Sequence, residues 1–186
     1  MKHDLLHKIN KPEIQWQEIK LVIFDCDGVI SDGKIIYCGE ELEAKHFSAH
    51  DGMGFMLLNR AELMCAVITG RSSVVLERRC RDLRIPHLYQ GVANKLEKAK
   101  QLLKELNLQW DNVAYMGDDW NDIPVMQSVA FSVTPADAMP EIKHLADYVT
   151  TRISGDGAAR ECIDYILHKK GLYEKAVSLY LKEITQ

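Results

Sequence analysis

Residues 21–28 read Leu-Val-Ile-Phe-Asp-Cys-Asp-Gly, an apolar run that ends in two carboxylates one residue apart and then a glycine. The apolar run shows no polar alternation, which is typical of a strand covered on both faces in a parallel sheet. Asp25 and Asp27 would then lie at the carboxyl end of that strand, where open α/β sheets bind ligands. We expect Gly28 to relieve steric demand where the chain turns away. We expect Cys26 to pack into the core as a small hydrophobic residue.

Further apolar runs alternate with helix-like patterns along the rest of the chain. Strands are expected at residues 21–24, 66–68, 87–89, 113–116, 129–133 and 148–149. Helices are expected at residues 54–63, 74–83, 93–106, 123–128, 138–145, 158–168 and 173–182. This alternation predicts an α/β fold, a doubly wound (Rossmann-like) parallel sheet with helices on both faces.

One segment interrupts the alternation. Residues 32–47, DGKIIYCGEELEAKHF, contain two strand-like pieces around Gly39 and predict a small β-hairpin. It is either a surface decoration or a flap beside a site at the strand ends. No gap between the motifs is long enough for a separate cap domain, so we expect a single domain over residues 1–186. Its amphipathic tail at 173–186 would cover either its own domain or a neighbour's site.

Composition and charge exclude several classes of function. The chain has 186 residues, of which 47% are hydrophobic and 27% charged, as in ordinary globular proteins. A net charge of −4 gives no electrostatic case for a nucleic acid or an anionic membrane as partner. The five cysteines show no CxxC spacing, which disfavours a disulfide framework or a zinc site. Free thiols and the lack of a signal-like or membrane-spanning apolar run predict a cytoplasmic protein.

Polar residues collect at the carboxyl ends of the expected strands. They are Asp25, Asp27, Thr69, Gly70, Arg71, Lys95, Asp118, Asp119 and Asp122. Each is a weak signal alone, since a DxD usually makes a turn and a helical lysine is usually solvated. Because the carboxyl ends of parallel strands meet at one edge, an acid pair, a hydroxyl, an ammonium and a second acid cluster are expected to lie together there.

A cluster of carboxylates needs a cation. At about 4 Å, two like charges repel by roughly 4 kcal/mol at an effective dielectric of 20. Oxygen-only donors suit Mg²⁺, which keeps several waters and binds substrate phosphate. Mg²⁺ and Lys95 would let an anionic carboxylate approach an anionic phosphate. The Thr69 hydroxyl and the backbone N–H groups near Gly70 could hold phosphoryl oxygens.

This order of residues resembles the haloacid dehalogenase superfamily of phosphotransferases. The four matching motifs are DCDG at 25–28, Thr69, Lys95 and GDDWND at 117–122. The resemblance implies that Asp25 is a nucleophile that accepts the phosphoryl group as an aspartyl phosphate. It implies that Asp27 protonates the leaving alkoxide and then acts as base toward water.

The resemblance also implies which residues hold the ligands. Mg²⁺ would be bound by Asp25, the backbone carbonyl of Asp27 and Asp118, with Asp119 and Asp122 as supporting residues. The substrate would be bound by Thr69, Gly70, Arg71 and Lys95. Arg71 and Lys45 are candidate anion contacts, but a solvated surface position is the competing interpretation of both, and it is stronger for Lys45.

From about Lys20 to Leu172 the chain is similar to the family of 3-deoxy-D-manno-octulosonate 8-phosphate phosphatases. The matching stretches are residues 87–91, 113–119, 124–126, 146–152 and 157–161. The resemblance implies a homotetramer with the hairpins at its centre and neighbouring subunits completing each site. It implies hydrolysis of a small sugar-acid phosphate for the lipopolysaccharide inner core.

Two departures from that family leave the substrate open. His50 stands where many relatives have Arg, and residues 154–157 read SGDG where relatives often have consecutive glycines. Another phosphatase of the group, acting on an acylneuraminate 9-phosphate or a related ulosonate phosphate, is therefore an alternative. A receiver-like signalling domain uses a similar set of residues, but the DxDG order disfavours it. A non-catalytic interaction protein is disfavoured because every expected catalytic side chain is present.

Overall fold

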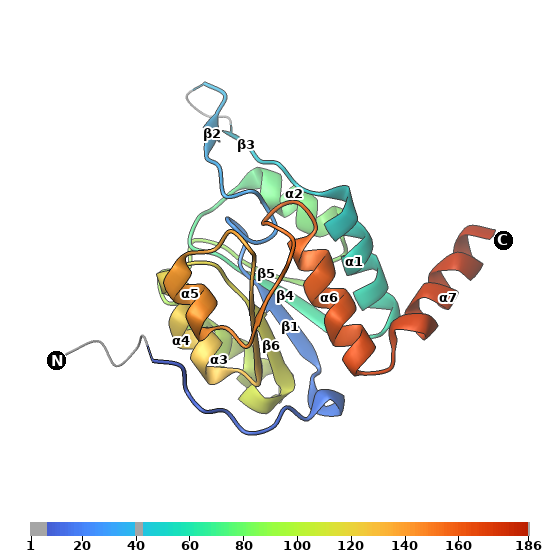
Figure 1. Cartoon of the computed structure of the whole chain (residues 1–186). Helices are drawn as coiled ribbons and strands as arrows, with labels where there is room; N and C mark the ends of the chain where they lie inside the picture. Colours follow the sequence, from blue (N-terminus) through green and yellow to red (C-terminus); the bar gives the residue numbers. More distant parts are fainter. Residues whose placement is uncertain (1–6, 40–42, 186) are drawn as a thin grey trace.

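The computed structural model describes residues 7–39 and 43–185, and a six-stranded parallel sheet forms its centre (Figure 1). The strands run in the order β5-β4-β1-β6-β7-β8. Their bounds are β1 Leu21–Phe24, β4 Met64–Ile68, β5 His87–Tyr89, β6 Val113–Met116, β7 Phe131–Thr134 and β8 Tyr148–Val149. The predicted fold class is confirmed. The strand order reverses between β1 and β6, which is where such sheets open a crevice for ligands.

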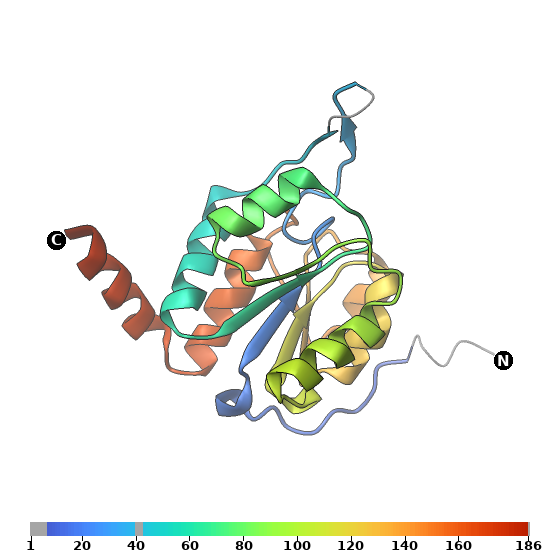
Figure 2. The ribbon, with the colours of Figure 1, turned by 180° about the vertical axis from the view of Figure 1, so that it is seen from behind.

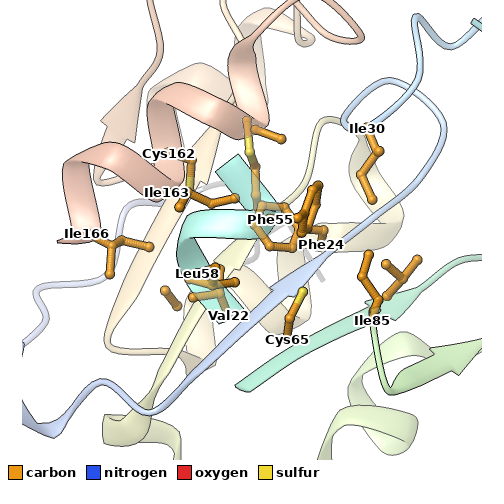
Figure 3. Close-up of a cluster of buried hydrophobic side chains, with 14 of the residues drawn as sticks. Val22, Phe24, Ile30, Phe55, Leu58, Cys65, Ile85, Cys162, Ile163 and Ile166 are labelled. Carbon is orange, nitrogen blue, oxygen red and sulfur yellow. The ribbon is translucent and has the colours of Figure 1, made fainter. Parts of the chain in front are cut away.

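Helices cover both faces of the sheet because the side chains of each strand alternate between two cores. Val22 and Phe24 of β1 join one buried cluster, whereas Leu21 and Ile23 join the other. The first cluster includes residues of α1 (Ala49–Arg60), α2 (Val74–Asp82) and α6 (Ala158–Lys169). The second includes residues of α3 (Lys95–Leu106), α4 (Ile123–Ser128) and α5 (Pro140–Leu145). Figure 3 shows Phe24 packed against Phe55 of α1 in the first cluster.

The start of α1 was predicted wrongly, because the helix begins at Ala49 and not at Gly54. The Ser48 side chain caps it by accepting the backbone N–H of His50 at 3.1 Å. Gly52 lies within the turn that was missed, and Gly54, the first residue of the expected helix, serves packing. A Cβ there would lie 3.0 Å from Cδ of Arg160, so the glycine lets α1 approach α6 closely.

The predicted hairpin is present and consists of β2 (Ile36–Tyr37) and antiparallel β3 (Glu43–Ala44). Residues 40–42 of its predicted range lie outside the described residues. We call residues 32–39 and 43–47 the flap; it projects from the body of the molecule (Figures 1 and 2). A bridge between Ser31 and Phe47 closes its base. Gly155 packs so tightly on that base that a Cβ would overlap the backbone of Asp32.

The C-terminal helix and the cysteines complete the description of the fold. The C-terminal helix α7 (Tyr173–Thr185) packs on α1 and projects from the body (Figure 1). No helix in the described ranges is both long and apolar enough to cross a bilayer.

The cysteines are unpaired, and Cys26 is fully buried in the core as expected. Burial, assisted by neighbouring Asp27, raises the pKa of its thiol well above the usual range.

Candidate active site

The carboxyl ends of β1 and β6 place three carboxylates together. Asp25 directly follows β1, and its backbone N–H donates to the carbonyl of Met116, the last residue of β6. Asp118 follows β6 by two residues, and Asp122 ends the short helix η4 (Trp120–Asp122). Oxygens of these three side chains all lie within 4.8 Å of one another. The switch point of the sheet therefore carries the densest negative charge of the site.

A cleft of about 160 Å³ opens at this edge. It is lined by Asp25, Asp27, Thr69, Gly70, Arg71, Asp118, Asp119 and Asn121. Seven of the nine predicted site residues line the cleft directly, while Lys95 and Asp122 lie buried beside it. Asn121 also lines the cleft and was not among the predicted site residues. It lies inside the GDDWND motif, of which only the aspartates were predicted to act.

Lys95 is the cation buried among these acids. Its side chain is 1% exposed, and its Nζ lies 2.8 Å from Asp25 Oδ2 and 2.6 Å from Asp122 Oδ1. Burial alone would lower the pKa of Lys95, but the charges of Asp122 and Asp25 outweigh burial and raise it. The lysine is thus charged, and it fixes Oδ2 of Asp25 without contacting Oδ1.

Asp122 organises the site without a free oxygen. Its Oδ1 accepts from Lys95 and from the Tyr115 hydroxyl at 2.5 Å, and its Oδ2 accepts the N–H groups of Asp118 and Asp119 at 3.0 and 3.2 Å. A side chain on Gly117 would overlap Asp122. Asp122 therefore positions its neighbours, as a supporting residue should. Tyr115 escaped sequence reasoning because it lies inside the apolar run of β6.

The remaining oxygens fit a divalent cation. Asp25 Oδ1 and Asp118 Oδ1 are buried and have no hydrogen-bond partner among the described residues. Burial, followed by the charge of Asp122, raises the pKa of Asp118 to about 8 and that of Asp25 to about 6. A hard cation between the two carboxylates would satisfy both oxygens and offset this crowding. Ligation by the Asp27 carbonyl stays a prediction.

The Asp27 side chain belongs to a different set of contacts. Its Oδ1 accepts from Ser31 Oγ at 3.2 Å and forms an ion pair with Lys45, and its Oδ2 lies 3.7 Å from Nε of Arg71. The stronger interpretation of Lys45, a solvated surface residue, was wrong, since its side chain is only 2% exposed. The returning strand of the flap brings it inward, which the local sequence does not reveal. Asp25 and Asp27 thus occupy separate environments, as residues with different roles require.

Gly28 is required by the geometry of the site. It adopts φ +82°, and a Cβ there would overlap the Asp118 carboxylate. We predict that Gly28→Ala displaces Asp118 and weakens Mg²⁺ binding about 10- to 100-fold, as measured by calorimetric titration. Gly171→Ala is the matched control, because Gly171 has φ +67° and nothing within 4 Å of its Cβ position. Equal Mg²⁺ affinity in the two variants would contradict this account.

Known proteins are similar to this chain in sequence and in architecture. Residues 85–161 match a family model described as haloacid dehalogenase-like hydrolase. The chain is 44% identical over 160 residues to 3-deoxy-D-manno-octulosonate 8-phosphate phosphatase KdsC of Escherichia coli K12, covering 86% of this chain and 85% of the relative. The KdsC protein of Yersinia pestis is 44% identical over 161 residues, covering 87% and 86%.

Solved structures agree with these relatives. The phosphatase of the same name from Moraxella catarrhalis, in complex with a magnesium ion, a phosphate ion and a KDO molecule, is 32% identical. It superimposes with a TM-score of 0.85 over 97% of this chain and 99% of that chain. The Yersinia pestis crystal structure is 43% identical, with a TM-score of 0.83 over 86% of both chains.

Proposed function

The chain belongs to the family of 3-deoxy-D-manno-octulosonate 8-phosphate phosphatases, within the haloacid dehalogenase-like hydrolases, and we propose that it hydrolyses this ester to the free sugar acid and phosphate. It is a phosphoric monoester hydrolase that uses Mg²⁺, and the reaction would supply the lipopolysaccharide inner core. The observation that carries the proposal is the state of the Asp25 carboxylate at the cleft. Lys95 holds its Oδ2, and its Oδ1 has no hydrogen-bond partner among the described residues. The relatives are phosphatases, which decides against a receiver-like domain.

The residues support a two-step displacement. Asp25 attacks phosphorus, the bond from phosphorus to the sugar oxygen breaks, and Asp27 donates a proton to the leaving alkoxide. Asp27 then accepts a proton from the water that attacks the phosphorus of the aspartyl phosphate. Mg²⁺, held by Asp25 and Asp118, would supply positive charge that lets the anionic ester approach. Lys95 keeps Asp25 ionised and aimed, and Asp122 keeps Lys95 in place.

The residues that directly follow β4 would bind the phosphoryl group. Thr69 is buried, and its backbone N–H donates to the carbonyl of Tyr89 at 3.0 Å, which holds it beside Gly70 at the cleft. The guanidinium of Arg71 is 40% exposed and lies 3.7 Å from both Asp27 and Glu43. It is placed to meet the negative charge of a substrate at the cleft mouth.

The nine-carbon alternative rests on the position of the two departures. His50 lines a second cavity of about 440 Å³ with Arg152, Gly157 and Arg160, so both departing segments meet there. Asp51, next to His50, is fully buried and accepts the N–H of Gly157 at 3.3 Å, which ties the two segments together. Changes at His50 and in residues 154–157 would therefore act on one surface.

The test is phosphate release from a panel of sugar phosphates with and without Mg²⁺. The panel contains 3-deoxy-D-manno-octulosonate 8-phosphate, an acylneuraminate 9-phosphate and hexose phosphates. We expect strong preference for the octulosonate ester and complete loss of activity in EDTA. Preference for the nine-carbon ester would keep the chemistry and replace the substrate. Equal activity toward every ester would contradict the assignment to a sugar acid.

We also propose that the protein is a cytoplasmic, single-domain enzyme that works as a homotetramer, with the flaps as contact. Ile35 is 50% exposed and Tyr37 72% exposed, which leaves an apolar surface on the flap. We predict that glutamate at both Ile35 and Ile36 yields smaller assemblies with weaker activity, as measured by sedimentation velocity. Ile9→Glu, at an equally exposed site outside the flap, is the control. An unchanged sedimentation coefficient in the flap variant would exclude the flap as the contact.

A further inference from the structure

The flap delivers one buried ammonium to the site. Lys45 directly follows β3, its side chain is 2% exposed, and its Nζ pairs with Oδ1 of Asp27. We propose that Lys45 is the positioning residue for Asp27, so that the flap holds the acid–base carboxylate in its working orientation. This inference rests on the proposed phosphatase function.

A buried ammonium is costly unless it is paired, so its placement limits what Lys45 can do. Lys34, at the other end of the same flap, shows the contrast. Its side chain is 71% exposed and pairs with Asp32, also within the flap. Lys45 instead makes a contact across 18 residues to a motif that the reaction uses. Of the two flap lysines, Lys45 therefore contacts the catalytic site, whereas Lys34 is an ordinary surface charge.

The Asp27 carboxylate is held on one side only. Ser31, which is fully buried, and Lys45 both approach Oδ1, and the backbone bridge from Ser31 to Phe47 fixes their common base. Within residues 7–39 and 43–185, the nearest charged partner of Oδ2 is Nε of Arg71, at 3.7 Å. One oxygen is thus anchored, and the other is available for proton transfer at the cleft.

The same strand also holds the anion-binding arginine. The Glu43 carboxylate of β3 lies 3.7 Å from the guanidinium of Arg71. Strand β3 and the residue after it therefore contact both the acid–base carboxylate and the phosphate-binding side of the cleft. A change in flap position would therefore move both groups together.

The role predicts an effect that depends on the leaving group. A sugar alkoxide needs a proton to leave, whereas p-nitrophenolate is a stable anion that leaves without one. Formation of the aspartyl phosphate from p-nitrophenyl phosphate is therefore independent of Asp27. Hydrolysis of that aspartyl phosphate still needs Asp27 as the base that activates water. A loosened Asp27 would slow the first step only for the sugar ester, and would slow the second step for both substrates.

The experiment compares Lys45→Met with the wild-type protein by rapid mixing in saturating Mg²⁺. We expect kcat for the octulosonate ester to fall about 100-fold with little change in KM. With p-nitrophenyl phosphate we expect a burst approaching one p-nitrophenolate per subunit, followed by a slow steady state. Lys34→Met should match the wild type in both assays. Lys45→Met in an Asp27→Asn background should cause no further loss, because Lys45 acts through Asp27.

Two results would overturn the proposal. One is an unchanged kcat in Lys45→Met. The other is a proportional loss of burst and turnover together, which a general disturbance of the fold would cause. A wrong assignment of the substrate would show in the wild-type protein and is distinguishable from a wrong role for Lys45. If the wild-type protein rejects the octulosonate ester, the sugar phosphate it hydrolyses fastest takes its place, and the p-nitrophenyl phosphate arm is unaffected.

Discussion

Replacing Asp25 with Asn is expected to abolish phosphatase activity, lowering kcat by about 10⁴-fold or more. An amide is a poor nucleophile, and it cannot carry the negative charge that Mg²⁺ and Lys95 would stabilise. The fold should not suffer equally. Burial and the charge of Asp122 raise the pKa of Asp25 to about 6, so the fold disfavours its ionised form. We therefore expect the free energy of unfolding in EDTA to stay the same or to increase, as measured by urea denaturation.

Asp111→Asn is the control, since Asp111 is exposed in the short helix η3 (Trp110–Asn112), which precedes β6 at the opposite end of the strand. It removes the same charge far from the cleft and should leave kcat and stability unchanged. An Asp25→Asn protein with full activity would remove the covalent mechanism. An inactive but strongly destabilised one would show that Asp25 is needed chiefly for folding.

Replacing Lys95 with Met is expected to harm both activity and stability. The methionine fills a similar volume but leaves Asp25 and Asp122 as buried carboxylates without their shared cation. Removing one partner of a buried ion pair costs about 3–5 kcal/mol. We expect a loss of that size in urea denaturation without metal. Added Mg²⁺ should recover part of it, because the cation would offset the same charge. Activity should fall even in saturating Mg²⁺, since Asp25 loses its orientation.

Lys100→Met is the matched control in the same helix. Its side chain is 49% exposed and pairs with Glu97 at the surface, so its replacement should change stability by less than about 0.5 kcal/mol. If Lys95→Met were as mild as Lys100→Met, the buried triad of Asp25, Lys95 and Asp122 would not be the organising contact of the site.

Much of the fold could be predicted because its elements are locally encoded. The apolar runs of β1 and β6 could hardly be anything but buried parallel strands, and topology then brings Asp25 and Asp118 to one edge. The glycine after the DxD could be interpreted from its backbone freedom alone. The close approach of Gly28 to Asp118 adds a reason that only three-dimensional packing shows.

The missed features depend on contacts between distant segments. Lys45 looks like a surface residue in the flap, yet the way the flap folds back buries it against Asp27. Tyr115 looks like one more apolar core residue, yet its hydroxyl donates to Asp122. The expected helix began five residues late, at Gly54, whose lack of a side chain serves the contact with α6. In each case tertiary packing, and not local propensity, decides the role.

The most direct test of this account is to identify the residue that carries the phosphoryl group. The protein is mixed with excess substrate and Mg²⁺, quenched, and treated with borohydride, which reduces an acyl phosphate to an alcohol. Peptide mass spectrometry then locates the modified residue. The account predicts homoserine at position 25 in the wild-type protein and none in Asp25→Asn. Homoserine at another aspartate, or none during sustained turnover, would contradict it.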